Sequence, residues 1–295
     1  MKKEKQSKNS IEQDIVVLYH NGCHDGFGGA WAAWKKFKNK ALYVGVEHGK
    51  DIPAGLVDKD IYCIDFCYNE EVMSSLLAVN NKVVVLDHHF SQRDVVGIST
   101  EHVYDNDRSG SVIAWQYFFP KEAVPKLLKH IQDVDLWKFN VPHTKELMSA
   151  LDEYEFDFKV WNKIAAAFED KELIKKYLEA GRTILKYNER IIERLVRHAE
   201  HVVFEGVDAY AINVPLLESE IGNWIVEHKK AVAIMWAYKG GGVKVSLRSD
   251  GKTDVSALAQ RYGGGGHKAA AGFAFDVNVT FPWVKQVTKK KSPIV

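Results

Sequence analysis

The chain has 295 residues, of which 46% are hydrophobic and 27% are charged, a composition typical of a folded globular protein and long enough for two domains. Lys plus Arg number 40 against 39 Asp plus Glu, so the chain lacks the basic excess of proteins that track long nucleic acids. No apolar run approaches the ~18 residues of a membrane span, and no apolar signal core follows the N-terminus. We therefore expect a cytoplasmic protein with no membrane partner.

The first part of the chain alternates short apolar runs with helical patterns. Residues 14–19, 41–46, 60–66 and 82–87 are expected to be strands. Residues 28–37, 70–79, 110–119 and 124–132 are expected to be helices. Continuous apolar strands separated by helices favour a mostly parallel sheet that is covered on both faces.

A second alternation follows a long helical region. Residues 145–200 carry an apolar stripe at helical spacing with few turn residues, which predicts a helical connection. Strands are then expected at 201–206, 207–214, 231–238 and 242–248, with helices at 216–228 and 254–262. The fold class is therefore α/β: a domain at 13–144 with a mostly parallel sheet, a helical linker at 145–200 and a smaller α/β domain at 201–280. Residues 1–12 are expected to form a disordered tail and residues 281–295 a basic tail.

Metal-type ligands follow three of the expected strands. They are His20, Cys23, His24 and Asp25 after the first strand, Asp65 in the second, and Asp87, His88 and His89 after the third. The carboxyl ends of parallel strands meet at one sheet edge, and a carboxylate beside an apolar sheet is costly unless it is paired or coordinated. Any one of these residues alone would be an ordinary cap or turn residue, but together they predict a cation site. Imidazole and carboxylate ligands favour Mn²⁺, Co²⁺ or Mg²⁺ over structural Zn²⁺.

Two motifs resemble those of a known family. The run VVVLDHHF (83–90) resembles the Asp-His-His signature of the DHH phosphoesterase superfamily. The run GGGGHKAAAGF (263–273) resembles the glycine-rich motif of the associated DHHA1 domain. The resemblance covers roughly residues 14–275, and it is greatest to the nano-RNase or oligoribonuclease-like branch, whose members carry one domain of each kind.

The resemblance implies a set of metal ligands around two divalent cations, most simply Mn²⁺. These ligands are His20, Asp25, Asp65, His88 and Asp135, with Asp65 bridging the two metals. Asp133 is the close alternative to Asp135. Asp65, Asp87, His88 and His89 are then the catalytic group, in which Asp87 orients the two histidines and His89 contacts the phosphate.

The first motif departs from the family pattern. Many relatives carry two Asp residues and a His there, whereas this chain reads His20-Asn-Gly-Cys23-His24-Asp25. Either Cys23 or His24 fills the missing position, or one metal is held loosely. A nucleophilic Cys23 would need a base and an oxyanion hole, and is the weaker interpretation. Cys63 and Cys67 are expected to be small buried residues.

The second domain is expected to bind the substrate. Arg248 follows a strand where DHHA1 relatives carry a residue that grips phosphate, although a surface Arg is the plain alternative. The glycines at 263–266, in particular Gly264, Gly265 and Gly266, could present backbone amides to an anion, with His267 beside them, or could form a helix C-cap and turn. The amides at 109–111 offer a similar choice between an anion cradle and an N-cap.

These features together predict a metal-dependent phosphodiesterase with its site between the two domains. The resemblance to the nano-RNase branch implies that the substrates are short RNA or DNA oligonucleotides, or linear dinucleotides, which are hydrolysed to 5′-mononucleotides. A phosphatase acting on small nucleotides such as 3′-phosphoadenosine 5′-phosphate is the alternative enzyme. A nucleotide-binding regulator with a decayed metal site is the alternative outside catalysis, and a homodimer is left open.

Overall fold

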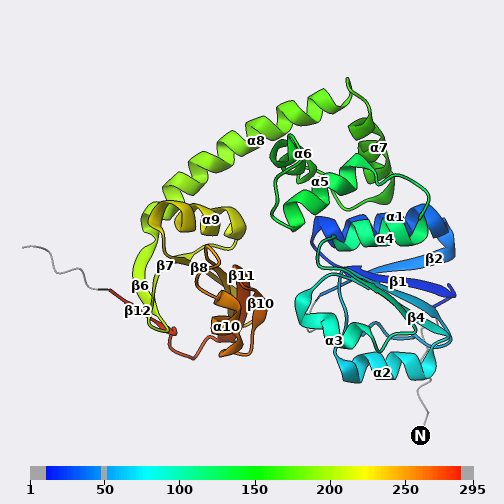
Figure 1. The fold of residues 1–295 in the computed structure, drawn as a ribbon, viewed down its shortest axis with the longest axis horizontal. Coiled ribbons are helices and arrows are strands. Elements are labelled where there is room, and N and C mark those ends of the chain that lie inside the picture. Colours follow the sequence, from blue (N-terminus) through cyan, green and yellow to red (C-terminus); the bar gives the residue numbers. More distant parts are fainter. Residues whose placement is uncertain (1–10, 48–51, 287–295) are drawn as a thin grey trace, which may run out of the picture. The chain divides into compact units, whose positions relative to one another are not determined.

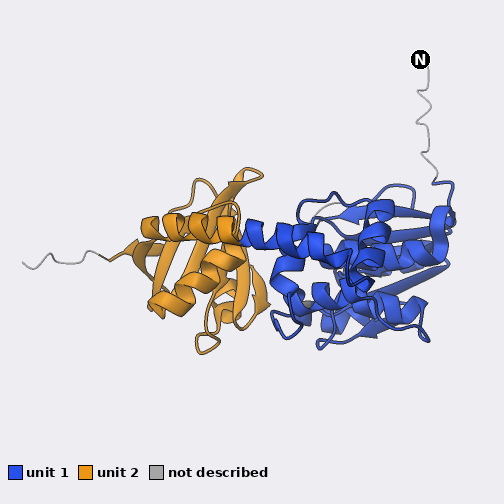
Figure 2. Ribbon diagram, turned by 90° about the horizontal axis from the view of Figure 1, so that it is seen from above, with its two compact units in different colours: residues 1–185 blue, residues 186–295 orange. Residues whose placement is uncertain are grey.

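The structure is a computed structural model that describes residues 11–47 and 52–286. The chain divides into two compact units, residues 1–185 and residues 186–295 (Figure 2). The expected tails at 1–12 and 281–295 lie for the most part outside the described residues. Each unit is built on its own sheet, and each has its own hydrophobic cores.

Unit 1 contains a five-stranded sheet in the order β2-β1-β3-β4-β5, in which every neighbouring pair is parallel. Its strands are β1 Ile15–His20, β2 Ala41–Val46, β3 Asp60–Ile64, β4 Lys82–Asp87 and β5 Glu101–Tyr104. The first four confirm the sequence-based expectation. β5 was not predicted, because it has only four residues and exposes Glu101 and His102 at the sheet edge.

Helices cover both faces of this sheet (Figure 1). The helices α1 His24–Phe37 and α4 Gly110–Phe118 cover one face, and α2 Glu70–Val79 and α3 Arg93–Val96 cover the other. Fully buried aromatic residues such as Phe27 and Trp31 fill the first interface. Met73 and Leu76 of α2 fill the second. The covered parallel sheet confirms the α/β class.

Three further helices extend the core on the α1 side: α5 Lys126–Asp135, α6 Thr144–Leu151 and α7 Phe158–Glu169. Trp161 and Phe168 of α7 are fully buried in the same core as Phe27 and Trp31. By packing, α6 and α7 are therefore part of unit 1 and not of a separate linker. The division between Leu185 and Lys186 falls within α8 Ile174–Leu195. As extents of the two family domains, 13–144 and 201–280 remain predictions.

Unit 2 contains a seven-stranded sheet in the order β10-β11-β9-β8-β7-β6-β12. Its strands are β6 Glu200–Phe204, β7 Val207–Asn213, β8 Val232–Lys239, β9 Gly242–Arg248, β10 Gly265–His267, β11 Ala270–Asp276 and β12 Trp283–Lys285. Only β7 and β8 pair in parallel. Ile221 and Ile225 of α9 Glu218–Lys229 pack on one face of the sheet, and α10 Val255–Gln260 packs on the other. Short 3-10 turns follow α1, β4 and α8, at η1 Lys38–Lys40, η2 Phe90–Gln92 and η3 Val196–His198.

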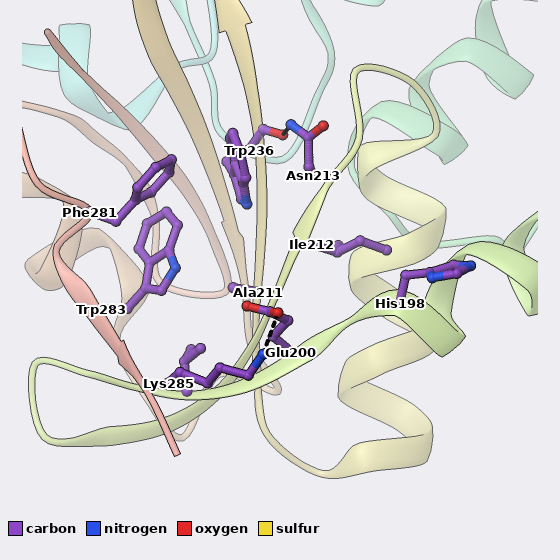
Figure 3. A pocket seen from close by; sticks show the side chains of 10 residues that line it. His198, Glu200, Ala211, Ile212, Asn213, Trp236, Phe281, Trp283 and Lys285 are labelled. Carbon is purple, nitrogen blue, oxygen red and sulfur yellow. Dashed lines mark hydrogen bonds and ion pairs between the residues drawn. The ribbon is translucent and has the colours of Figure 1, made fainter. Parts of the chain in front are cut away.

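The expected basic tail is wrong for residues 281–286. Trp283 of β12 pairs with Phe204 of β6, and its ring lies 4.9 Å from that of Phe281. Lys285 and Glu200 join the same two strands through an ion pair of 2.6 Å (Figure 3). Two aromatic residues close to the C-terminus gain burial by extending the sheet, which the neighbouring lysines of the sequence obscured.

Within the described ranges, every helix is too short or too polar to cross a membrane.

The alternation along β12 yields a test of its role in unit 2. Trp283→Ala should lower the free energy of unfolding by about 1–3 kcal/mol, because a partly buried aromatic ring loses its packing. Val284 is 73% exposed, so Val284→Ala is the matched control and should change the free energy by less than about 0.5 kcal/mol. Urea unfolding of the full chain measures both, and an effect of Trp283→Ala as small as that expected of the control would mean that the packing of Trp283 adds no stability.

Candidate metal centre

The first ligand run joins the end of β1 to the start of α1. Cys23 has an extended backbone, and its Sγ accepts a hydrogen bond of 3.2 Å from the Gly26 amide, so α1 begins at His24 and not at residue 28. A side chain at Gly26 would place its Cβ 2.1 Å from the carbonyl oxygen of His20. Glycine at this position therefore lets the helix start directly against the strand end.

Asp25 ties α1 to α4. Its two carboxylate oxygens accept hydrogen bonds from the amides of Gly110 at 2.6 Å and Ser111 at 3.0 Å. The amide of Ser109 donates to the side-chain oxygen of Gln132 at 3.1 Å. All three amides at 109–111 are thus bound within the protein, and the anion cradle that the sequence left open is wrong.

Asp65 lies directly after β3 and is buried with a positive φ of 64°, a conformation that costs free energy for any residue with a side chain. Its Oδ2 is 3.3 Å from Nδ1 of His20 and accepts a hydrogen bond of 3.4 Å from Cys23 Sγ. The backbone of α4 comes so close that a Cβ on Gly110 would lie 2.7 Å from Cβ of Asp65. The strained backbone is therefore held in place by neighbours on several elements.

His88 follows β4 and faces three carboxylates. Its Nε2 lies 3.2 Å from Oδ1 of Asp65, 3.5 Å from Oδ2 of Asp135 and 3.9 Å from Oδ2 of Asp25. Although the first distance is that of an ion pair, neither His88 Nε2 nor Asp65 Oδ1 makes a hydrogen bond of acceptable geometry within the described residues. Buried polar atoms without such partners are uncommon, and here both point to a shared cation.

Asp87 fixes the neighbouring histidine. Its Oδ1 accepts hydrogen bonds from the amides of His88 at 2.8 Å and His89 at 3.3 Å, and from His89 Nδ1 at 2.8 Å. Since the carboxylate can only accept, Nδ1 of His89 carries the proton in this hydrogen bond. This geometry agrees with the expected orienting role of Asp87.

The pKa values reflect an excess of carboxylates. Burial and the nearby Asp135 and Asp65 carboxylates raise the pKa of Asp25, and burial with Asp65 raises the pKa of Asp135 to about 6. Burial acts to lower the pKa of His88, but the carboxylates around it raise that pKa to about 9. Burial also acts to raise the pKa of Asp65, yet its interactions with His20 and His88 hold that pKa below the usual range. A divalent cation would stabilise all of these carboxylates in their charged form.

The donor atoms fit metal ions in overlapping groups. The groups are His20, Cys23 and Asp65; Asp65, His88 and His89; and Asp25, His88 and Asp135, with donor atoms in each group within 4.8 Å of one another. Asp65 and His88 each belong to two of the groups, and of the two only Asp65, with its two carboxylate oxygens, has the donor atoms to bridge a pair of ions. Carboxylate oxygens and imidazole nitrogens with a single thiol suit Mn²⁺, Co²⁺ or Mg²⁺. These residues can hold divalent metal.

Two of the expected alternatives lie away from these groups. His24 packs between the rings of Phe156 and Trp161, and burial lowers its pKa to about 4. Asp133 accepts hydrogen bonds from the amides of Asn140 and Val141, at 2.8 and 3.0 Å, and from the hydroxyl of Thr144. We therefore keep Asp135 over Asp133, and Cys23 over His24.

The cysteines differ in their surroundings. Burial and the carboxylates of Asp65 and Asp25 raise the pKa of Cys23, which disfavours a thiolate nucleophile in the protein without metal. Cys63 and Cys67 are buried in the core beneath α2 and α3, as expected.

The expected substrate contacts belong to unit 2, whereas the metal ligands belong to unit 1. The guanidinium of Arg248 donates to Ser219 Oγ at 2.9 Å and to the carbonyl of Leu247 at 2.9 Å. Gly265 and His267 lie in β10, which pairs with β11. At Gly264 a Cβ would lie 2.1 Å from the carbonyl oxygen of Gly272, and at Gly266 one would lie 2.6 Å from that of Ala270. The close approach of two strands therefore explains part of the glycine run, and roles in substrate binding remain predictions.

Sequence reasoning missed how Gly26, Gly110 and Gln132 shape the centre. A glycine at the first position of a helix, preceded by serine, was the available signal for Gly110. Gln132 carried none, because its contact with Ser109 joins two helices that are distant in the sequence.

Gly110 provides a test of the close packing at the centre. Gly110→Ala should lower the free energy of unfolding by about 1–3 kcal/mol, because the added methyl group overlaps Asp65. Mn²⁺ affinity should fall by about tenfold or more as Asp25 and Asp65 shift. Gly97→Ala is the matched control, since a Cβ there meets no atom within 4 Å. Calorimetric titration with Mn²⁺ measures the affinities, and equal values for the two variants would refute the packing argument.

Comparison with known proteins agrees with this fold and these motifs. The family model of the DHHA1 domain matches residues 224–280. The uncharacterized protein R106 of Acanthamoeba polyphaga mimivirus is 33% identical in an alignment of 297 positions, which covers 91% of this chain and 70% of that protein. Oligoribonuclease NrnB of Bacillus subtilis is 24% identical over 231 residues, covering 69% of this chain and 55% of NrnB.

Solved structures share the fold at low sequence identity. The exopolyphosphatase-related protein of Bacteroides fragilis superposes with a TM-score of 0.51 and 15% identity, covering 91% of this chain and 88% of that one. RecJ of Thermus thermophilus, solved with Mn²⁺, superposes with a TM-score of 0.53 and 16% identity, covering 89% of this chain and 49% of RecJ. With the Asp87-His88-His89 motif at the end of β4 and the matched C-terminal domain, the chain belongs to the DHH phosphoesterase superfamily and carries a DHHA1 domain.

Proposed function

We propose that this protein is a metal-dependent hydrolase that cleaves the phosphodiester bonds of short oligonucleotides or linear dinucleotides and releases 5′-mononucleotides. The observation that carries the proposal is the cluster of Asp25, Asp65, His88 and Asp135. Two buried atoms of this cluster that could bind a metal, Oδ1 of Asp65 and Nε2 of His88, lack hydrogen-bond partners within the described residues. Such a cluster suits metal-assisted phosphoryl transfer better than it suits a structural role.

The residues of the centre divide into two roles. His20, Cys23, Asp25, Asp65, His88 and Asp135 would hold two divalent ions, most simply Mn²⁺. When bound, such ions polarise phosphoryl oxygens and lower the pKa of water. Asp87 accepts a hydrogen bond from Nδ1 of His89 and so orients the ring. When both ring nitrogens of His89 are protonated, Nε2 would donate a hydrogen bond to a phosphate oxygen as negative charge builds on it. We further propose that Arg248, His267 and the amides of Gly264–Gly266 in unit 2 bind substrate phosphate.

Short nucleic acids are favoured as substrates by the relatives and by the charge of the chain. NrnB, the similar protein from Bacillus subtilis, is named an oligoribonuclease. The chain itself carries 40 basic against 39 acidic residues, and so lacks the overall basic excess that is typical of proteins that track long nucleic acids. A substrate of a few nucleotides needs only the cations within one site.

A second candidate, a nucleotide-binding regulator with a weakened metal site, is favoured by one observation: Cys23 stands where a carboxylate is expected. The same assays distinguish it from the enzyme, because a regulator would bind nucleotides without turnover.

The bridging role of Asp65 yields the first functional test. Asp65→Asn should reduce phosphodiesterase activity in Mn²⁺ by more than about 100-fold, since a shared ligand affects both metals. Asp60→Asn, at the opposite end of β3, is the matched control and should retain wild-type activity. Hydrolysis of bis-p-nitrophenyl phosphate measures both variants, and wild-type activity after Asp65→Asn would exclude the assignment.

Substrate length provides the second test. We expect kcat/KM to be highest for about two to five nucleotides, because only phosphates inside one site add to transition-state binding. Labelled RNAs of two, five, twelve and about twenty-four nucleotides should be compared in Mn²⁺ at moderate salt. A rate that rises steadily with length would point to a processive exonuclease instead.

A further inference from the structure

A groove lies between α4 and α5 in unit 1. It has a volume of about 480 Å³, within the range of small-molecule sites. Seven of its ten lining residues are polar or charged and three are valines, and they come from α4, α5 and the segments next to these helices. They are Arg108, Val112, Gln116, Val124, Lys129, Gln132, Asp133, Lys138, Asn140 and Val141.

The groove adjoins the metal centre through both helices. α4 begins at Gly110, whose amide binds Asp25, and α5 ends at Asp135. Gln132 lines the groove and lies three residues before Asp135, which places their Cβ atoms about 5–6 Å apart on one side of the helix. The groove and the metal centre therefore share two helices.

The groove carries an excess of positive charge. Its only lining carboxylate, among the residues described, is Asp133, and both oxygens of Asp133 already accept hydrogen bonds from the amides of Asn140 and Val141. Against it stand Arg108, Lys129 and Lys138. The groove therefore favours an anion.

The three basic side chains differ in the polar partners that they already have. Arg108 pairs with Asp105 at 2.7 Å, and Lys138 donates to the carbonyl of Asp107 at 3.3 Å. Lys129 is exposed, and its amine makes no hydrogen bond or ion pair within residues 11–47 and 52–286. This amine can bind a phosphate without giving up an existing ion pair.

The cavity in unit 2 provides a contrast. It is lined by Trp236, Phe281 and Trp283, and its Lys285 is already paired with Glu200 (Figure 3). An anion there would have to displace that pair. The groove of unit 1 is thus the better candidate for a nucleotide phosphate.

We propose that the groove between α4 and α5 is a nucleotide subsite that binds the nucleotide next to the scissile phosphate. Lys129 and Lys138 would bind its outer phosphate, and the side-chain amides of Gln116 and Asn140 would meet its base. This subsite rests on the proposed function, since it presumes a substrate of at least two nucleotides. It would make unit 1 itself selective for dinucleotides over single phosphate esters.

Equilibrium binding tests the subsite without relying on turnover. The probe is a fluorescently labelled, 5′-phosphorylated diadenylate with a phosphorothioate linkage, titrated in Mn²⁺ from about 50 to about 300 mM salt. Lys129→Ala and Lys138→Ala should each weaken binding roughly three- to tenfold and reduce the salt slope by about one, and the double variant by about two. The control is the double variant Lys121→Ala/Lys126→Ala, which removes the same charge from exposed positions outside the groove.

The outcomes separate the two proposals. A double groove variant with the affinity and salt slope of the control would overturn the subsite, as would a wild-type protein that does not bind the dinucleotide. If the wild type binds it through Lys129 and Lys138 but fails to cleave the unmodified dinucleotide in Mn²⁺, the subsite stands and the proposed enzyme activity falls. Because Lys129 is exposed, the Lys129→Ala variant should fold. The test therefore stays valid even if Lys138→Ala disturbs the segment after α5.

Discussion

Asp65 leaves β3 with a left-handed backbone and places its buried carboxylate against His20, Cys23 and His88. A carboxylate in this position costs free energy twice, once for the backbone conformation and once for desolvation. The surrounding structure compensates with imidazole groups and with the close approach of α4, which only a glycine at position 110 permits. The packing of the sheet edge in unit 1 depends on keeping this one group in place.

Hydrogen bonds connect α1, α4 and α5 around this carboxylate. Asp25, at the start of α1, binds the first amides of α4, which favours its negative charge through the helix dipole. Gln132 of α5 binds the amide of Ser109 and so joins the helix that carries Asp135 to the helix that carries Gly110. The ligands on different elements are therefore not independent, and a change at one contact is expected to displace the others.

Unit 2 follows a different principle. Its mixed sheet is extended at one edge by β12, where Trp283 and Phe281 add aromatic packing, and at the other edge by the short strand β10. The glycine run permits β10 to approach β11 closely, so part of that motif is required by the fold whatever its role in binding. A motif can thus meet a structural need and a functional one with the same residues.

The sequence alone determined the parallel sheet, because short, continuous apolar runs separated by helices leave few other arrangements. It also indicated His20, Asp25, Asp65 and the Asp87-His88-His89 motif, because strand ends in such a sheet share one edge. Only the tertiary structure shows how the contacts of Asp133 differ from those of Asp135 and the contacts of His24 from those of Cys23, and Asp135 and Cys23 as metal ligands remain predictions. Both members of each pair have suitable chemistry, and the choice depends on which side chain the packing turns toward Asp65. The same holds for β12 and for α6 and α7, whose place in a core depends on contacts between residues far apart in the chain, which no local pattern encodes.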